Sequence, residues 1–144
     1  MLARRELSEA QLRQRLTRHG HPSSAIDEAV ARLIDARSLD DARVAAAIAR
    51  TELTVKGRGR LRVLRRIHAA GIAADLGERA VAEAFQDVDE EALLASALEK
   101  RLRGQRLISD ERERARLYRF LLGQGFESDR VLALLRARQR RSPT

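Results

Sequence analysis

The chain of 144 residues has no cysteine, few aromatic residues and no long apolar run. Without cysteine, disulfides and thiolate metal sites are excluded. No apolar stretch approaches the roughly 18 residues that cross a bilayer, and no signal-peptide core follows the first methionine. These absences predict a soluble, cytoplasmic protein without membrane contact. Aromatic residues make up only 3% of the chain, so leucine, isoleucine, valine and alanine must fill the core, as suits helices.

Lysine is also scarce, although the chain as a whole is basic. Among 29 basic residues, against 21 acidic ones, only Lys56 and Lys100 are lysines, and the formal net charge is +8. Such a balance favours polyanionic partners. The abundance of arginine and alanine also fits a GC-rich genome, so the positions of the arginines carry more information than their number.

An internal repeat is the strongest pattern in the sequence. Short basic segments end at Gly20, Gly71 and Gly125, and an amphipathic segment follows each glycine. Aligning these glycines also aligns apolar residues at three further positions: Leu12, Val63 and Leu117; Leu16, Ile67 and Leu121; Val30, Val81 and Leu135. A repeat of about 50 residues is typical of stacked helical units. The sequence therefore predicts an elongated, all-α tandem array whose function lies on an extended surface.

Each complete unit is expected to contain three helices: a leading helix, a basic helix that ends in glycine, and a third helix. The leading helix of the second unit matches that of the third at an offset of 50, with aliphatic residues in equivalent places. The expected units are residues 1–38, 39–86 and 87–144. The first of these lacks most of its leading helix, and the last ends in a basic tail.

Polar residues mark the expected helix starts. Ser8 with Gln11 fits a capping box, and Ser24 with Asp27 offers a second one. Asp40 and Asp41 open the leading helix of the second unit, which is predicted to carry Val44, Ile48 and Val55.

The most basic segment covers residues 50–66, where seven basic residues face one acidic residue, Glu52. On a helix that starts near Gly59, the arginines at 62, 65 and 66 share one face. The glycine-rich start leaves backbone amides open to an anion, and the helix dipole adds partial positive charge. We interpret the segment as a docking surface for carboxylates or phosphates, formed by Arg50, Lys56, Arg58, Arg60, Arg62, Arg65 and Arg66. The alternative is a solvated face.

The basic helix of the third unit repeats this pattern. Its candidate partner-binding or phosphate-binding residues are Arg112, Arg116 and Arg119. A basic stripe along one side of the array and an ordinary solvated surface both remain open for these residues.

No constellation points to catalysis, a metal or a cofactor. His19, His21 and His68 lack the spacing and the further ligands of a tetrahedral site. Asp40 and Asp41 are adjacent, so on a helix they diverge by about 100°, and capping explains them better than acid–base chemistry. The glycines at 57 and 59 lack the lysine and hydroxyl of a phosphate-binding loop. The protein is not expected to be an enzyme.

Three motifs, in order and at matching spacing, resemble the RecX family of regulators of the RecA recombinase. They are Leu-Ala-Arg-Arg-Glu at residues 2–6, Leu-Asp-Asp-Ala-Arg at 39–43, and Lys-Gly-Arg-Gly at 56–59 followed by Leu61 and Arg62. The family often has an aromatic residue where this chain has Leu7, and phenylalanine where it has Val44. Both replacements are apolar, so they are expected to adjust the core.

The resemblance implies a protein that binds the RecA–DNA nucleoprotein filament and inhibits its recombinase and ATPase activities. Separate contacts along an array suit such a filament. A monomer is expected, although the sequence leaves oligomeric state open, as it does the choice between capping filament ends and coating the groove.

Two other functions stay open: non-specific DNA binding through phosphates, and a helical scaffold for another protein. Sequence-specific reading by helix–turn–helix units is disfavoured by charge. The expected recognition helix at residues 25–37 has a net charge of −1 and that at residues 73–85 a net charge of −2, and both would repel phosphates.

Overall fold

A computed structural model of the chain describes residues 7–36, 39–105 and 107–139. This part contains helices and no strand, apart from an isolated bridge between Ile108 and Gln139. The helices are α1 (Glu9–Arg18), α2 (Ser23–Asp35), α3 (Asp41–Arg50), the π-helical η1 (Thr51–Val55), α4 (Arg60–Ala69), α5 (Ala74–Ala84), α6 (Glu90–Leu102), α7 (Glu111–Gly123) and α8 (Ser128–Arg138).

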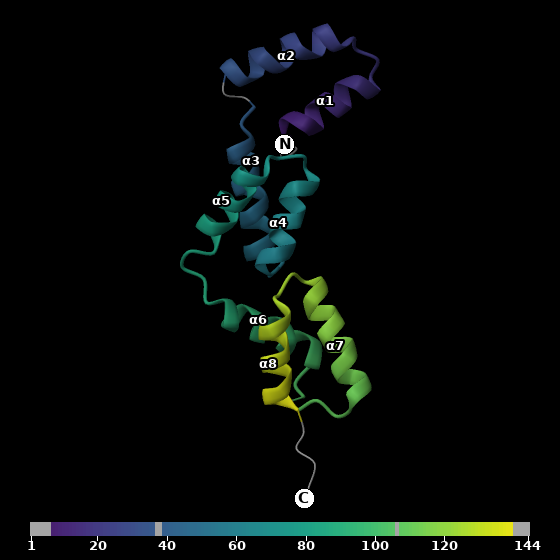
Figure 1. Cartoon of the computed structure of the whole chain (residues 1–144), viewed down its shortest axis with the longest axis vertical. Coiled ribbons are helices and arrows are strands. Elements are labelled where there is room, and N and C mark those ends of the chain that lie inside the picture. Colours follow the sequence, from purple (N-terminus) through teal and green to yellow (C-terminus); the bar gives the residue numbers. More distant parts are fainter. Residues whose placement is uncertain (1–6, 37–38, 106, 140–144) are drawn as a thin grey trace, which may run out of the picture.

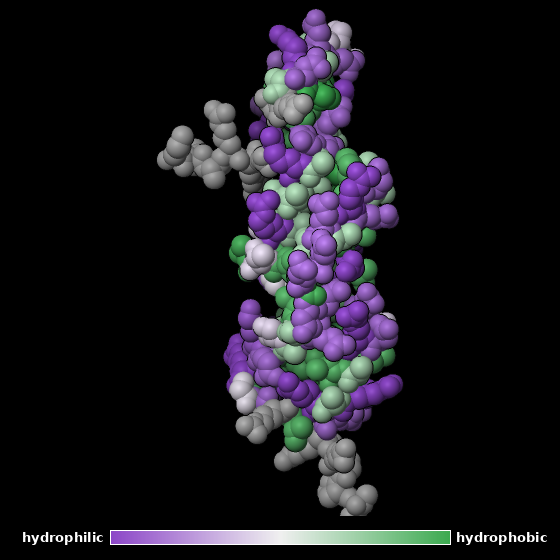
Figure 2. Space-filling model, turned by 90° about the vertical axis from the view of Figure 1, so that its left-hand side faces the viewer, coloured by the Kyte–Doolittle hydropathy of each residue, from purple (hydrophilic) through white to green (hydrophobic). Residues whose placement is uncertain are grey.

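The helices form three groups along a long axis, α1–α2, α3–α5 and α6–α8 (Figure 1). Viewed from the side, the molecule is a narrow rod with hydrophilic residues over most of the visible face (Figure 2). The elongated all-α array is thus confirmed. The unit boundaries at residues 38/39 and 86/87 stay predictions, and residues 1–6, where the short leading helix of the first unit was expected, lie outside the described residues.

Each group has its own apolar cluster, and the repeat positions lie in it. Val63, Ile67, Leu117 and Leu121 are buried, while their counterparts in the first group, Leu12 and Leu16, pack partly buried against its core. The positions that follow the glycines are buried in all three groups: Val30, Val81 and Leu135. The apolar positions that repeat in the sequence are therefore the positions that form or contact the core of each group.

The three aligned glycines end their helices in the left-handed conformation. Gly20, Gly71 and Gly125 have φ of 83°, 78° and 103°, values that side chains with a Cβ rarely adopt. The amide of each glycine donates to the carbonyl three residues before it, at 3.0, 2.9 and 3.0 Å, which closes the last turn.

Two of the three predicted caps are confirmed. Ser8 accepts from the amide of Gln11 at 3.1 Å while Gln11 Oε1 accepts from the amide of Ser8 at 3.0 Å, and Asp40 caps α3. The box predicted at Ser24 is wrong, because Pro22 is the N-cap of α2 and no side chain caps that helix. Asp27, its expected partner, instead binds Arg13 of α1 at 2.7 Å.

The second leading helix carries Val44, Ile48 and Val55 as predicted, but Val55 at its end does not face the core. Val55 is 77% exposed, whereas Glu52 is 4% exposed. The cause is the π-helical segment Thr51–Val55, since the wider π turn shifts the register set by Val44 and Ile48. Glu52 and Leu53 therefore face inward and Val55 faces outward.

Candidate functional site

Buried Glu52 organises the most basic region of the molecule. Its Oε2 lies 3.3 Å from Lys56 Nζ, and its Oε1 lies 3.9 Å from Arg66 Nε. The π-helical segment turns this carboxylate inward, and the next turn of chain brings Lys56 to it. Because both cations are about half exposed, Glu52 holds them in place while their charged groups still reach solvent.

A groove runs between the end of η1 and one face of α4. It encloses about 530 Å³ and is lined by Glu52, Lys56, Arg62, Arg65, Arg66 and Gly123. We call these residues the basic groove. Four cations and one carboxylate give it a net charge of +3, and the shared face predicted for the three arginines is the face that lines it. Planar guanidinium groups so arranged suit bidentate binding of carboxylates or phosphates.

Three of the predicted binding residues instead contact the third unit. Arg58 donates from Nη1 to Gln124 Oε1, and Arg62 donates from Nη1 to the carbonyl of Gly123 at 3.0 Å. Arg60 forms two hydrogen bonds of 3.2 Å with Glu90, and its guanidinium carbon lies 5.2 Å from the centre of the Phe85 ring. Arg62 both lines the basic groove and holds the junction, whereas Arg58 and Arg60 lie outside the groove.

The anion site predicted at the start of α4 is wrong. The amide of Gly59 donates to the carbonyl of Gln124 at 2.8 Å, and that of Leu61 donates to the carbonyl of Gly125 at 3.0 Å. Turn carbonyls of the third unit thus take the place that an anion would need. The glycine at 59 serves this contact, since a Cβ there would lie 2.6 Å from the backbone of Gly125.

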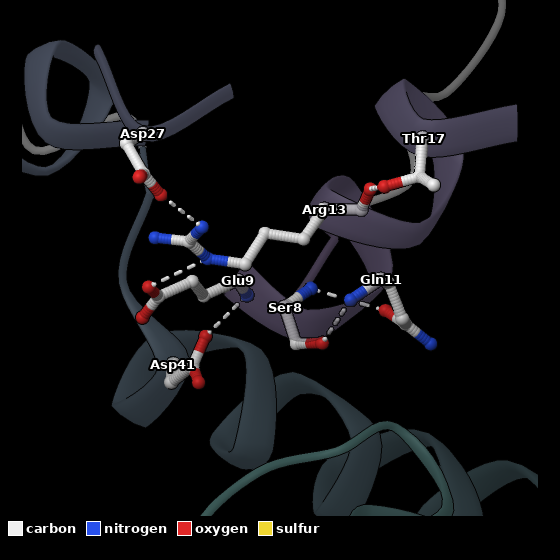
Figure 3. A network of polar contacts seen from close by, with 7 residues as sticks. All are labelled: Ser8, Glu9, Gln11, Arg13, Thr17, Asp27 and Asp41. Atoms are coloured by element: carbon white, nitrogen blue, oxygen red, sulfur yellow. Dashed lines mark hydrogen bonds and ion pairs between the residues drawn. The ribbon is translucent and has the colours of Figure 1, made fainter. Parts of the chain in front are cut away.

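The same kind of junction joins the first unit to the second. The N-cap hydroxyl of Ser8 donates to the carbonyl of Ala70, next to Gly71, as the amide of Gly59 donates to Gln124, next to Gly125. The amide of Glu9 donates to Asp41 at the start of the next leading helix, at 2.8 Å, a contact that Figure 3 draws. In both junctions, the start of a basic helix lies against the glycine turn of the following unit.

Arg13 lies at the centre of the polar network in Figure 3. Its Nη1 contacts Asp27 at 2.7 Å and its Nε contacts Glu9 at 3.2 Å. Hydrogen bonds with Asp27 and Glu9 raise the pKa of Arg13 above its ordinary value. The network ties α1 to α2. Because Arg13 is paired with two carboxylates, its charge is not available to bind a partner.

The remaining candidates are exposed but separate from the basic groove. Arg50 ends α3 and does not line the groove. Arg112, Arg116 and Arg119 follow one another at helical spacing on one exposed face of α7. Within the described residues, no hydrogen bond or ion pair occupies their side chains, whereas neighbouring Arg114 pairs with Glu111 at 3.6 Å.

The described residues contain neither a candidate metal site nor a helix that could span a membrane. No cluster of three or more histidine or acidic side chains there could hold a metal ion, and His19, His21 and His68 are exposed. No helix among those described has the length and apolar character to cross a bilayer.

Two features of the seam between the second and third units were not predicted from the sequence. One is the role of Gln124 and Gly125, which contact the start of α4 and the residues just before it. Arg58 and Gln124, for example, are 66 positions apart in the sequence. The other is Glu52, although its place as the one acidic residue within a run of cations could have marked it.

The fold and surface define a tandem array of three-helix units with a basic seam. A family model for the first three-helix domain of RecX matches residues 1–33, and one for its third three-helix domain matches residues 89–135. The chain belongs to the RecX family of regulatory proteins.

Relatives and solved structures agree with this assignment. The chain is 30% identical over 134 residues to a regulatory protein RecX of Halorhodospira halophila, covering 92% of this chain and 80% of the relative. It is 31% identical to the RecX of Vibrio parahaemolyticus, covering 91% and 82%. The crystal structure of RecX from Lactobacillus salivarius has the same fold, with a TM-score of 0.68 at 19% identity over 91% of this chain and 84% of that one.

Proposed function

We propose that this protein binds the RecA–DNA filament and inhibits its recombinase and ATPase activities, as a non-enzymatic regulator in the cytoplasm. Membership of a family of regulatory proteins supports a regulator. The observation that carries the proposal is the basic groove. It presents Lys56, Arg65 and Arg66 on a seam braced by contacts between two units, so the cations are positioned before a partner arrives.

The groove narrows the set of residues proposed to contact the filament. Arg65 and Arg66 are exposed and project from the middle of α4, whereas Arg58 and Arg60 hold the array together. Replacing Arg58 or Arg60 would alter the junction as well as the surface. Arg65 and Arg66 are therefore the residues to replace in a test of filament binding.

The first experiment measures ATP turnover by preformed RecA filaments with increasing amounts of the protein. We expect inhibition at substoichiometric amounts, and we expect Arg65→Ala with Arg66→Ala to weaken it at least tenfold. Removing one exposed charge-assisted hydrogen bond costs about 1 kcal/mol, so removing two weakens binding by more than a factor of about ten. Arg79→Ala with Arg130→Ala, on exposed faces of α5 and α8, is the matched control.

A second enzyme separates filament binding from competition for DNA. An unrelated DNA-dependent ATPase should keep its activity at the same concentrations of the protein. Equal inhibition of both enzymes would contradict filament recognition. Unchanged potency of the Arg65 and Arg66 double variant would remove the basic groove from the mechanism.

Non-specific DNA binding is the second candidate function, and the exposed face of α7 favours it. Arg112, Arg116 and Arg119 have no carboxylate partner among the described residues, and phosphates would accept their hydrogen bonds. Such binding would fall steeply with salt, by a slope that reports the number of phosphate contacts. Replacing all three by alanine should lower that slope by about three.

A further inference from the structure

A second groove opens on the same seam and shares Lys56 with the basic groove. It encloses about 410 Å³ between η1 of the second unit and α6 and α7 of the third. Its apolar lining comes from both units: Leu53, Val55, Leu93, Ala97 and Phe120. We call it the apolar groove. Since the backbone contacts of Gly59 and Leu61 fix the two units against each other, its walls are held in place.

Cations lie beside this apolar lining, and no carboxylate is among the lining residues, although Lys56 pairs with Glu52 of the basic groove. Lys56, Lys100 and Arg101 line the groove, together with uncharged residues only. The chain's only two lysines thus lie on one groove. Arg101 lies over Phe120, with its guanidinium carbon 4.3 Å from the ring centre, so a cation stands directly beside the largest apolar group.

Val55 lies at the solvent-exposed rim of the apolar groove. Its side chain is 77% exposed, the most exposed of the large apolar residues described. A valine in this position contributes little to the core. It does extend the apolar lining outward, where an approaching side chain would meet it before the cations and would remove apolar area from water.

We propose that the apolar groove binds a short acidic segment of a partner protein that carries an apolar anchor side chain. The anchor would lie on Phe120, Leu93 and Val55, and its flanking carboxylates would pair with Lys100 and Arg101. A phosphate backbone would use the cations but leave the apolar lining exposed. This inference goes beyond the proposed function, because it concerns a different groove and a peptide ligand and does not depend on inhibition of the filament.

The test uses the whole protein and a fluorescein-labelled synthetic peptide in which glutamates flank one phenylalanine and one leucine. We expect saturable binding by fluorescence anisotropy. A peptide with serines in place of the phenylalanine and leucine should bind at least tenfold more weakly. Lys100→Glu with Arg101→Glu, and separately Val55→Asp, should each weaken binding of the first peptide at least tenfold.

Matched controls separate the groove from net charge and from folding. Arg79→Glu with Arg130→Glu makes the same change in charge elsewhere, and Ile34→Asp places a charge on another exposed apolar residue; both should change affinity less than twofold. Circular dichroism checks that every variant keeps its helical content and thermal midpoint.

Several outcomes would overturn the proposal. Equal binding of the two peptides would show that the cations alone bind the peptide and that the apolar lining has no part in it. Unchanged affinity in either groove variant would place the peptide elsewhere. Displacement of the peptide by an equal concentration of a single-stranded oligonucleotide would assign the groove to nucleic acid. Arg65→Ala with Arg66→Ala should leave peptide binding intact. The peptide assay therefore tests this groove independently of the filament binding proposed for the basic groove.

Discussion

At the scale of single residues, two buried polar side chains, Ser8 and Glu52, hold other groups in place. Ser8 has no exposed area, and its hydroxyl accepts from the amide of Gln11 while it donates to the carbonyl of Ala70. Glu52 holds two cations of the basic groove. The Ser8 hydroxyl therefore links the first unit to the second, whereas Glu52 and both of its cations belong to the second unit and order its surface from within.

Replacing Ser8 tests this link. Ser8→Ala removes both a helix cap and the hydrogen bond to the second unit, so the free energy of unfolding should fall by about 1–2 kcal/mol. Urea denaturation followed by circular dichroism measures the change. Thr17→Ala is the matched control, because the Thr17 hydroxyl bonds only within α1, to the carbonyl of Arg13 at 2.8 Å. Its effect should stay within about 0.5 kcal/mol; equal losses for both variants would contradict an inter-unit role for Ser8.

At the scale of elements, the glycine turns differ in what surrounds them. Gly20 and Gly125 share the left-handed conformation, but a Cβ at Gly20 would meet open space, whereas one at Gly125 would lie 2.4 Å from the backbone and Cβ of Arg62. Gly123 lies at the end of α7, with ordinary φ and open space around it. Substitution at Gly20 therefore tests backbone strain alone, substitution at Gly125 tests strain together with crowding, and substitution at Gly123 tests neither.

Alanine substitution should rank these glycines. Gly20→Ala should cost about 1–2 kcal/mol from the left-handed conformation alone. For Gly125→Ala, overpacking of the junction should add about 1–3 kcal/mol. Gly123→Ala should stabilise by about 0.5–1 kcal/mol, since alanine favours helix. Thermal unfolding of the three variants measures this order, and equal costs at Gly20 and Gly125 would contradict the tight junction.

The sequence predicted elements well and junctions poorly. The aligned glycines and apolar residues indicated the helix ends and the core, because local periodicity and conformation decide both. Periodicity carries no information on which distant backbone meets α4, so the contacts of Gly59 with Gln124 could not be predicted. The π turn that exposes Val55 and buries Glu52 also interrupts the α-helical period, so it could not be predicted from that period.

The candidate site was only partly predicted, because helical spacing describes one helix and not its contacts with distant residues. Helical spacing placed Arg62, Arg65 and Arg66 on one face, and they do line one groove. It could not tell that Arg58 and Arg60 turn toward the third unit, since Gln124 and Glu90 lie far along the chain. Which of these residues contact a partner stays a prediction.

At the scale of the whole molecule, the three units have unequal cores. Among the described residues, the first cluster contains three buried apolar side chains, Ile26, Val30 and Leu39, whereas the second contains eleven and the third nine. In a linear array each unit depends on its own core and on its neighbour. The first unit should therefore open most readily.

Hydrogen exchange measures this difference in the native protein. Amides of α1 and α2 should exchange at least tenfold faster than those in the middle of α4 and α7, because local opening of the first unit exposes little apolar surface. Ser8→Ala should speed exchange in α1 further and leave α7 unchanged. Uniform protection along the chain would contradict unequal units.

Co-sedimentation with RecA filaments assembled on single-stranded DNA, beside the same DNA alone, is the sharpest test of filament binding through the basic groove. At moderate salt, we expect the protein to sediment with the filament and to remain largely in solution with the naked DNA. The Arg65→Ala and Arg66→Ala double variant should lose most of its filament binding, while the Arg79→Ala and Arg130→Ala control should keep it. Equal sedimentation with DNA alone, or full binding by the groove variant, would refute binding of the filament through this groove.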